Sequence, residues 1–488
     1  MEEQTPRKKW PIILGIVVIL AGLGFWLTRG TTSERSLDEL SGKRPLLVEA
    51  ESERFPTISL ADPIGWAANE KPVAANGLEV VRFAEGLDHP RTMLTLPNGD
   101  VLVAQTNAPE GSGSGFFFKL FKTFVGAGDP SPDSIILLRD ADGDGKAEGR
   151  FAFRKDGMVS PSGMAFANGK LFIANHDAVQ AFDFTPGETE LKGEGKVVMD
   201  LPPAGNHWMR NLLLSKDGKA LYIAVGSASN IAEEGVVLEE GRAAIWELNL
   251  ETGRRRQFAG GMRNPNGMAW NPSTGELWAV VNERDMLGPD LVPDYLTNVP
   301  VGAQYGWPWL YWKDQMDWRV KYPIPDFLGE YTRRPEYSMG PHVAPLGLQF
   351  VSGGERMGTD YANGAFIARH GSWNRKPAVG YDVVFVAFDA NGNPQGLPKP
   401  VLTGFLTKDG DAHGRPTWLA WDKGGALLVS DDTAGIIWRT VATGAAPAAA
   451  IKPVVVARMP PRRQIDAPTA ASFRDDPEKV NPAGKAGQ

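Results

Sequence analysis

The feature that most constrains this chain is a short pattern that occurs six times between residues 89 and 430. Each copy has a Pro or Arg, an apolar alternation, a turn and a run of β-branched or aromatic residues. Each copy predicts a β-hairpin that cannot bury its apolar face alone, so six copies predict an all-β fold, a six-bladed β-propeller closed into a ring. The copies lie at residues 89–105, 161–175, 210–224, 265–280, 345–350 and 415–430.

Composition agrees with many short strands joined by tight turns. The 488 residues include 56 glycines, 38 prolines and 15 tryptophans. The net charge is −7 and no basic stripe is present, which gives no reason to expect a nucleic-acid partner. The absence of cysteine excludes thiolate metal sites, disulfides and cysteine nucleophiles.

The N-terminus carries an uncharged apolar run from Trp10 to Leu27, preceded by Arg7, Lys8 and Lys9. The run is long enough to cross a bilayer as a helix. Positively charged flanks tend to stay in the cytoplasm, which predicts that the chain after the run is exported. A cleaved signal peptide is the alternative, but no clear Ala-x-Ala-like site follows the run. We expect a membrane anchor, a linker and wrapping segment, the propeller and a loosely ordered tail at residues 1–30, 31–76, 77–444 and 445–488.

The histidines stand mostly at repeat starts or in turns, positions that crowd around one end of a propeller channel. For each, the alternative is a structural hydrogen bond to a loop carbonyl. The segment 205–211 is the richest in polar groups, and imidazole takes a proton readily near neutral pH, so His207 is the best candidate for a general base. The six are His89, His176, His207, His342, His370 and His413.

The next repeat opens with Arg263 and Asn264 ahead of a strand. An arginine stays protonated and can stabilise charge that develops on a carbonyl oxygen, so Arg263 is the candidate electrophile. The alternative is an arginine that bridges two blades through backbone carbonyls.

Acidic and carbonyl-rich loops favour a hard cation, and calcium is the expected metal. The strongest stretch runs from Asn282 to Asp285 and continues through Asp290, Asp294 and residues 305–308. A solvated acidic loop is the alternative. A second run, residues 140–145, begins like an EF-hand loop but has Phe151 at its twelfth position, which favours a blade turn over a weak calcium site.

Residues 205–212, 261–267, 281–308 and 370–375 together resemble the pyrroloquinoline quinone (PQQ)-dependent sugar dehydrogenases of the soluble glucose/sorbosone type. The likeness extends over residues 79–441 and is closer to the sorbosone branch. It implies that His207 removes the anomeric hydroxyl proton of the sugar while hydride passes to the quinone. It also implies that Arg263 and Asn264 polarise the acceptor carbonyl of the cofactor.

The same resemblance implies ligands for calcium and for the three cofactor carboxylates. The main-chain carbonyls of Glu283 and Arg284 fall where the cofactor's calcium is held, although Glu-Arg replaces the Gly-Pro pair of the glucose enzymes. Asp294 and Tyr305 fall where a structural calcium is bound. The residues implied to bind the cofactor are Arg210, Arg375, Arg415 and His370. His342 and His370 are implied to line the substrate end. Ser162 replaces a glutamine of the glucose enzymes, which predicts altered sugar contacts.

The expected function is oxidation of an aldose or a related aldehyde such as sorbosone, with PQQ and Ca²⁺ as cofactors and an unidentified respiratory electron acceptor. The expected location is the bacterial inner membrane, single-pass, with the catalytic domain in the periplasm. Two alternatives stay open: a calcium-dependent lactone hydrolase and a non-catalytic, membrane-anchored binding propeller. Arg and His, rather than carboxylates, stand at the repeat starts, which suits an anionic cofactor better than a hydrolytic metal site.

Overall fold

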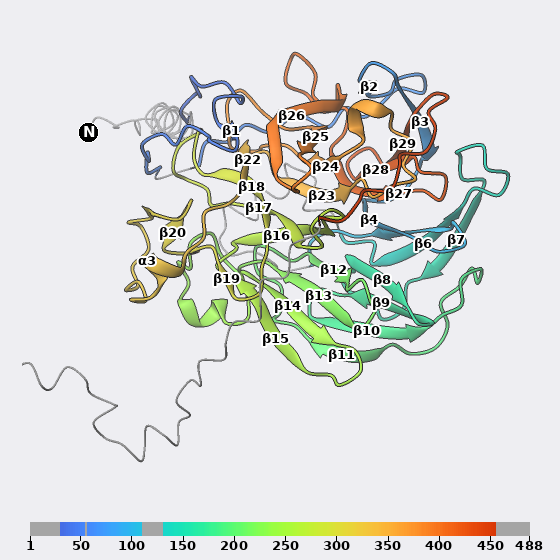
Figure 1. Cartoon of the computed structure of the whole chain (residues 1–488), viewed down its shortest axis with the longest axis horizontal. Coiled ribbons are helices and arrows are strands. Elements are labelled where there is room, and N and C mark those ends of the chain that lie inside the picture. Colours follow the sequence, from blue (N-terminus) through green and yellow to red (C-terminus); the bar gives the residue numbers. More distant parts are fainter. Residues whose placement is uncertain (1–29, 54–55, 110–129, 455–488) are drawn as a thin grey trace, which may run out of the picture. The chain divides into compact units, whose positions relative to one another are not determined.

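The computed structural model describes residues 30–53, 56–109 and 130–454, and these form six antiparallel sheets arranged as a ring (Figure 1). The innermost strand of each sheet contacts the innermost strands of both neighbouring sheets, which closes the ring. The six-bladed propeller predicted from the repeats is therefore confirmed. Every repeat coincides with the innermost strand of a blade or with its two innermost strands.

The strands of the blades, from the innermost outward, are as follows. Blade 1 has β4 (Pro90–Thr95), β5 (Val101–Gln105), β6 (Ser134–Arg139) and β7 (Gly149–Arg154); blade 2 has β8 (Gly163–Ala167), β9 (Lys170–Ala174), β10 (Ala178–Asp183) and β11 (Lys196–Asp200); blade 3 has β12 (Arg210–Leu214), β13 (Ala220–Val225), β14 (Ala244–Asn249) and β15 (Arg255–Gly260). Blade 4 has β16 (Asn264–Trp270), β17 (Leu277–Asn282), β18 (Pro293–Asn298) and β22 (Tyr337–Pro341); blade 5 has β23 (Pro345–Phe350), β24 (Gly364–Arg369), β25 (Asp382–Phe388) and β26 (Pro394–Thr403); blade 6 has β27 (Pro416–Trp421), β28 (Leu427–Asp431), β29 (Ile436–Ala442) and β3 (Leu78–Ala84).

Smaller elements extend these sheets. β1 (Ser41–Gly42), β2 (Val73–Ala74) and β19 (Ala303–Gln304) add short outer strands to blades 4, 5 and 3. A long insertion between β18 and β22 also carries the hairpin β20 (Leu310–Tyr311) and β21 (Gln315–Met316) and the helical turn α3 (Leu328–Tyr331).

The core lies between adjacent blades because alternate residues of a strand face opposite neighbours. In β5, Val101 and Val103 pack against blade 6, whereas Leu102 and Ala104 pack against blade 2. All four side chains are buried. The second strand of a blade is therefore apolar on both faces, because each face packs against a neighbouring blade.

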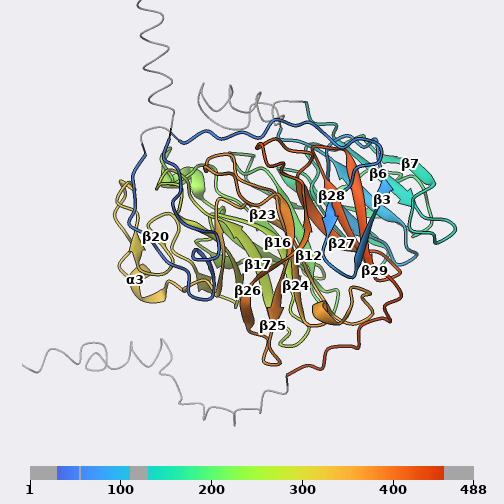
Figure 2. The same cartoon turned by 90° about the horizontal axis from the view of Figure 1, so that it is seen from above.

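The innermost strands all begin at one end of the ring, and the second strands end there too. The register pairs Pro90 with Gln105, Asn264 with Asn282 and Pro416 with Asp431. We call this the site end, because all the predicted catalytic residues stand at or beside these strand ends; the opposite end is the far end. Figure 2 shows the ring from the side, with the site end uppermost.

Two segments of the N-terminal region cross the site end and are called the strap: residues 51–53 and 56–66. The strap amides donate to loop carbonyls, Ser59 to Trp373 and Ile64 to Ala412. Figure 2 shows it as the blue trace along the upper side of the blades. No helix within the described ranges is long and apolar enough to cross a membrane. The predicted anchor run, residues 10–27, and most of the predicted tail lie outside the described residues.

Candidate active site

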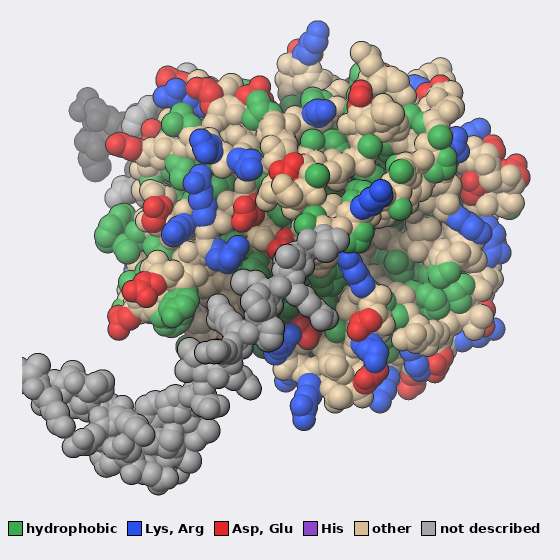
Figure 3. Space-filling model, viewed as in Figure 1, with side chains coloured by type: hydrophobic (Ala, Val, Ile, Leu, Met, Phe, Trp, Pro, Cys, Tyr) green, Lys and Arg blue, Asp and Glu red, His purple; other side chains and the backbone are tan. Residues whose placement is uncertain are grey.

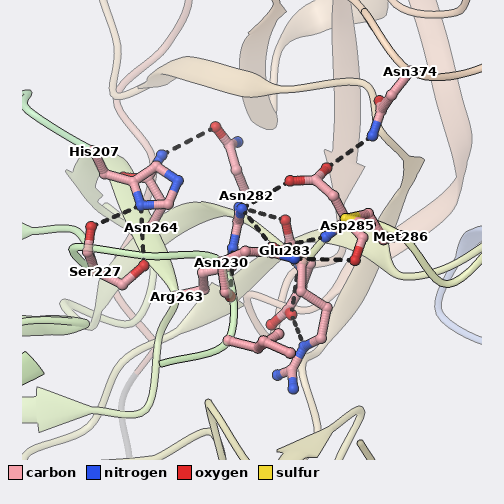
Figure 4. A network of polar contacts seen from close by, with 12 residues as sticks. His207, Ser227, Asn230, Arg263, Asn264, Asn282, Glu283, Asp285, Met286 and Asn374 are labelled. Atoms are coloured by element: carbon pink, nitrogen blue, oxygen red, sulfur yellow. Dashed lines mark hydrogen bonds and ion pairs between the residues drawn. The ribbon is translucent and has the colours of Figure 1, made fainter. Parts of the chain in front are cut away.

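His207 lies in the loop that leads into β12, and its two ring nitrogens have different surroundings (Figure 4). Nδ1 is 2.9 Å from the carbonyl oxygen of Ser227, which only accepts, so Nδ1 carries the proton. The Ser227 hydroxyl, 3.0 Å away, donates its own proton to the Ser229 carbonyl and so also accepts from Nδ1. The lone pair is therefore on Nε2. Burial, together with the nearby Arg263 cation, lowers the pKa of His207 to about 3, which keeps the ring neutral.

Gly226 allows His207 and Asn264 to come together. A Cβ at this position would lie 2.6 Å from the Cβ of His207 and 2.4 Å from Oδ1 of Asn264. Because both distances are shorter than real carbon contacts, any larger residue would push the two side chains apart.

The Arg263 guanidinium is fixed by four oxygens from two blades, one of which is the Asn230 carbonyl that accepts from Nε (3.2 Å). Nη1 donates to the carbonyl of Glu283 (2.6 Å), and Nη2 donates to Oδ1 of Asn230 (2.9 Å) and to Oδ2 of Asp285 (2.8 Å). The carbonyl of Arg263 in turn accepts from the amide of Ser227, the residue that orients His207 (2.8 Å). The general-base candidate and the cation are thus held in one framework.

Asp285 is the anionic partner within this framework. It also accepts from Nδ2 of Asn374 (2.9 Å) and lies 3.6 Å from Nδ1 of His342. Burial opposes its ionisation, but Arg263 and His342 outweigh burial and hold the pKa of Asp285 well below its usual range. Burial likewise opposes protonation of His342, yet the contact with Asp285 raises the pKa of that histidine.

Side-chain amides of blades 3 and 4 form a chain beside the two candidates. Asn264 and Asn266 each donate to Oδ1 of Asn282 (3.4 Å), and Asn211 donates to Asn266 (3.4 Å). Oδ1 of Asn211 is buried and has no hydrogen-bond partner among the described residues. A buried acceptor without a partner is expected to bind water or a donor group of a ligand.

A second polar cluster, on blades 5, 6 and 1, was only partly anticipated. Nε2 of His370 lies 3.0 Å from Oδ2 of Asp432, and the same oxygen accepts from Nη1 of Arg91. Burial and the neighbouring Arg415 lower the pKa of His370 to about 4. The sequence interpretation missed Arg91 and Asp432, although alignment of the repeats places Arg91 beside the start of an inner strand, as it places Asn264.

Arg91 connects this cluster to the His207 loop. Its guanidinium lies 5.6 Å from the centre of the Trp208 ring, and its Nε lies 3.4 Å from Sδ of Met209. Residues from five blades therefore converge at the site end.

The arginines at the site end are only partly neutralised by carboxylates. Within the described ranges, neither Arg210 nor Arg415 has a carboxylate within 4 Å. Arg415 donates to the carbonyls of His370 (3.1 Å) and Gly371 (2.9 Å). Arg91 and Arg263 are each paired with one aspartate. Arg210 and Arg415 are instead bonded to backbone carbonyls, so these two cations could pair with carboxylates of a ligand.

Two of the arginines predicted to bind cofactor are instead seen in structural contacts. Arg210 is buried and donates to the carbonyls of His207 (2.9 Å) and Met209 (3.0 Å), so it holds the catalytic loop; burial lowers its pKa to about 9. Arg375 is buried and bonded to Asp290 (3.0 Å) and Ser33 (2.7 Å). Their direct contact with a cofactor stays a prediction.

The residues predicted to hold calcium are brought together only in part. The Glu283 carbonyl accepts from Arg263, and the buried Arg284 side chain donates to the carbonyls of Pro308 (2.6 Å) and Leu310 (2.8 Å), which fastens the insertion. Asp294 accepts from the amides of Glu283 (2.7 Å) and Ala344 (2.8 Å), and burial raises its pKa to about 7.

The Tyr305 hydroxyl donates to the carbonyl of Asn298, at the end of β18 opposite to Asp294, so these two side chains are not adjacent. The four carboxylates that do cluster among the described residues lie elsewhere, in the β6–β7 turn at the far end, with ligand atoms within 4.8 Å of one another. The turn expected at residues 140–145 is confirmed. The sequence interpretation did not include its fourth carboxylate; the group is Asp140, Asp142, Asp144 and Glu148.

Two of the three remaining histidines make structural hydrogen bonds, while His89 lies 3.5 Å from Asp88. Nδ1 of His413 lies 2.7 Å from the carbonyl of Gly65, and its ring stacks on Trp66 at 4.7 Å. His176 accepts from the amide of Ala204 (3.3 Å). Ser162 is buried and bridges to the backbone of Arg210 (2.8 Å), so it supports the neighbouring blade.

Solved structures with the same fold include carbohydrate-active enzymes. A calcium structure of a Trichoderma reesei family AA12 protein has a TM-score of 0.63 at 21% identity and covers 76% of this chain and 97% of its own. The holo form of the pyranose dehydrogenase PQQ domain from Coprinopsis cinerea has a TM-score of 0.60 at 20% identity and covers 78% and 100%.

The sequence relatives are more similar in sequence but match a shorter part of the chain. A PQQ-dependent pyranose dehydrogenase of Coprinopsis cinerea is 30% identical over 151 residues, which is 26% of this chain and 19% of that protein. An uncharacterised protein of Borreliella burgdorferi is 27% identical over 301 residues, or 58% and 76% of the two chains. The sequence profile described as TrAA12-like matches residues 147–296 and 329–442, more than half of the chain. This chain therefore belongs to the TrAA12-like family.

Proposed function

We propose that this protein is a dehydrogenase that oxidises an aldose or a related aldehyde at the site end of the propeller, with PQQ as its cofactor. The observation that carries the proposal is the state of His207: Nδ1 is fixed on the Ser227 carbonyl, Nε2 keeps its lone pair, and Arg263 stands beside it. Family membership and the PQQ-dependent relatives support this assignment. Sorbosone is the specific substrate that we propose, and only the sequence motifs support it.

The side chains have distinct tasks in such a reaction. When bound, PQQ supplies the acceptor for the hydride. Nε2 of His207 takes the substrate hydroxyl proton, and the imidazolium that forms is stabilised through Nδ1–H on the Ser227 carbonyl. Arg263 and Asn264 supply donors for an oxygen that gains negative charge, since a guanidinium stays protonated throughout.

Cations at the site end without a carboxylate partner are the side chains that would hold carboxylates of the cofactor. Arg415 has no such partner among the described residues and is the best placed, with His370 beside it. Arg210 would contribute charge from below the surface, whereas Arg375 would have to exchange its pairing with Asp290 for a cofactor carboxylate. We further propose that Ca²⁺ binds through the carbonyls of Glu283 and Arg284, because carbonyl oxygen is a preferred ligand for this ion.

Membrane attachment completes the proposal. The apolar run at residues 10–27 is proposed as a single-pass anchor in the bacterial inner membrane, with the propeller in the periplasm and electrons passed to a respiratory acceptor.

Reconstitution tests the function. Purified full-length protein is incubated with PQQ and CaCl₂, and reduction of an electron-accepting dye is followed with a panel of aldoses and with aldehydes that include sorbosone. We expect dye reduction that requires both the quinone and a substrate. Protein that binds PQQ, shown by its absorbance, yet reduces no dye with any substrate would overturn the proposal, and lactone hydrolysis without PQQ would support the hydrolase alternative.

A further inference from the structure

The described chain begins at the site end and is bonded there. The amide of Ser33 donates to the carbonyl of Lys376 (2.7 Å), and its hydroxyl donates to Asp290 (2.6 Å) and accepts from the buried Arg375 (2.7 Å). Arg375 and Lys376 follow β24, and Asp290 follows β17, so both loops belong to the site end. Ser33 is thus a fixed point of the propeller and not part of a loose tether.

The distance from this fixed point to the apolar run is short. Five residues separate Leu27 from Ser33, and an extended chain covers at most about 3.5 Å per residue, so the separation is at most about 20 Å. A blade strand of six residues has a similar length of about 20 Å. If residues 10–27 cross a bilayer, Ser33 and the site end around it therefore lie close to the lipid surface.

Exposed apolar side chains surround the site end. Val237 and Leu238, in the loop between β13 and β14, are 80% and 52% exposed. Val159, whose carbonyl accepts from His176, is exposed in the loop that precedes β8. Ile58 and Ile64 are exposed on the strap, above blades 5 and 6. These five side chains come from different sides of the ring and form what we call the apolar rim.

Single exposed hydrophobic residues are normal, and one of them, Val301, lies toward the far end. The apolar rim differs because its members share one end with the point where the chain departs. Figure 3 looks onto the far end, where hydrophobic side chains lie among scattered lysine, arginine and acidic side chains.

We propose that the apolar rim docks the site end onto the lipid surface in which the protein is anchored. The occupant is the interfacial region of a phospholipid bilayer, into which the exposed valine, leucine and isoleucine side chains insert. The proposal rests on the proposed anchor but not on the identity of the reaction. Four glutamates flank Val237 and Leu238 in the sequence, so docking is expected to be stronger on neutral than on anionic lipid; they are Glu233, Glu234, Glu239 and Glu240.

The absence of native cysteine permits a direct test in the full-length protein. Val237→Cys places a thiol on the rim, and Asn391→Cys places one on an exposed turn at the far end, between β25 and β26. Each variant is labelled with bimane and reconstituted into phosphatidylcholine vesicles with or without doxyl-labelled lipid. We expect the doxyl lipid to reduce the fluorescence of the position 237 label by about half, because interfacial side chains lie within reach of the acyl boundary. The label at position 391 should be unaffected.

One further variant and two controls make the experiment able to contradict the proposal. Leu238→Asp in the Val237→Cys background should lessen the quenching, because a carboxylate beside the label opposes insertion. Equal quenching at both positions, or none at position 237 in protein that sediments with the vesicles, would overturn the proposal. Protein that stays in the supernatant would overturn it as well, since no anchor would then hold the domain. Fluorescence does not depend on turnover, so a failed dehydrogenase assay would leave this outcome independent.

Discussion

At the scale of single residues, the chemistry depends on which nitrogen of His207 is free. His207→Ala removes Nε2 and should slow oxidation by about 10²-fold or more while PQQ binding stays nearly intact, which is the usual effect of losing a positioned base. The measurement is turnover at saturating quinone, substrate and calcium, with PQQ binding followed by absorbance. His176→Ala is the matched control, since that imidazole accepts from the amide of Ala204 and should leave turnover unchanged. Near wild-type turnover of His207→Ala would place the active site elsewhere.

Arg263 should respond differently, because it is proposed to contact the quinone before and during the reaction. Arg263→Ala is expected to weaken PQQ binding and to lower turnover together. Arg263→Lys should recover only part of both, since an ammonium cannot reach the Glu283 carbonyl, Asn230 and Asp285 at once. Full recovery by lysine in steady-state kinetics would show that charge alone matters.

The titration of His207 offers a test that needs no cofactor. A pKa lowered to about 3 means that the ring binds a proton less readily than a free histidine, whose pKa is near 6.5. The ring should therefore stay neutral from pH 8 to pH 5, where an ordinary histidine becomes protonated. We expect the imidazole NMR signal that disappears in His207→Gln to show no shift over this range in the quinone-free protein, and to titrate normally in urea. A midpoint above pH 6 in the folded protein would contradict the burial of this ring.

At the scale of elements, the sequence predicts what is local and misses what is paired over long distance. Five inner hairpins were identified because each of those repeats carries its own turn and alternation, whereas only the first strand of the fifth, β23, was predicted. The placement of β3 in blade 6 could not be derived, since its partner β29 lies at the other end of the domain.

The same limit applies to the site. The sequence pattern identified His207, Arg263 and Asn264 because each stands directly before a repeat, in a segment rich in polar residues. Asp432 was missed because its role arises from contacts with Arg91 and His370, far away in sequence. The carbonyl contacts of the buried Arg210 and Arg375 are likewise invisible in a linear pattern.

The strap is held on blade 6 by Trp66, whose indole donates to the buried carboxylate of Asp431 (3.0 Å). Trp66→Phe keeps an aromatic ring against His413 but removes this donor. We expect the free energy of unfolding in urea to fall by about 1–2 kcal/mol, since a buried acceptor loses one partner. Ile64→Ala, an exposed strap position, should change it by less than about 0.5 kcal/mol. An equal loss in both variants would show that the strap is stabilised by packing alone.

At the scale of the whole molecule, calcium should act as a stabilising ligand. A metal that binds only the folded ring shifts the unfolding equilibrium by mass action, so CaCl₂ is expected to raise the Tm and EDTA to reverse the shift. Differential scanning calorimetry of metal-free protein, with MgCl₂ as the control salt, measures this effect. No change with calcium would remove the ion from the proposed site.

The pairing of β3 with β29 has a consequence for how the protein is made. Apart from the short outer strands β1 and β2, β3 is the first strand of the ring to be synthesised, yet its neighbour is completed only with Ala442, after every other blade. During translation, β3 therefore has no partner strand, and Val80 and Phe83 are unburied. Joining two ends so far apart carries a large loop-closure entropy, and an unpaired strand edge invites association with other chains. We therefore expect the nascent chain to be prone to association until blade 6 has been synthesised. A chain truncated before β27 would leave the ring open between blades 5 and 1.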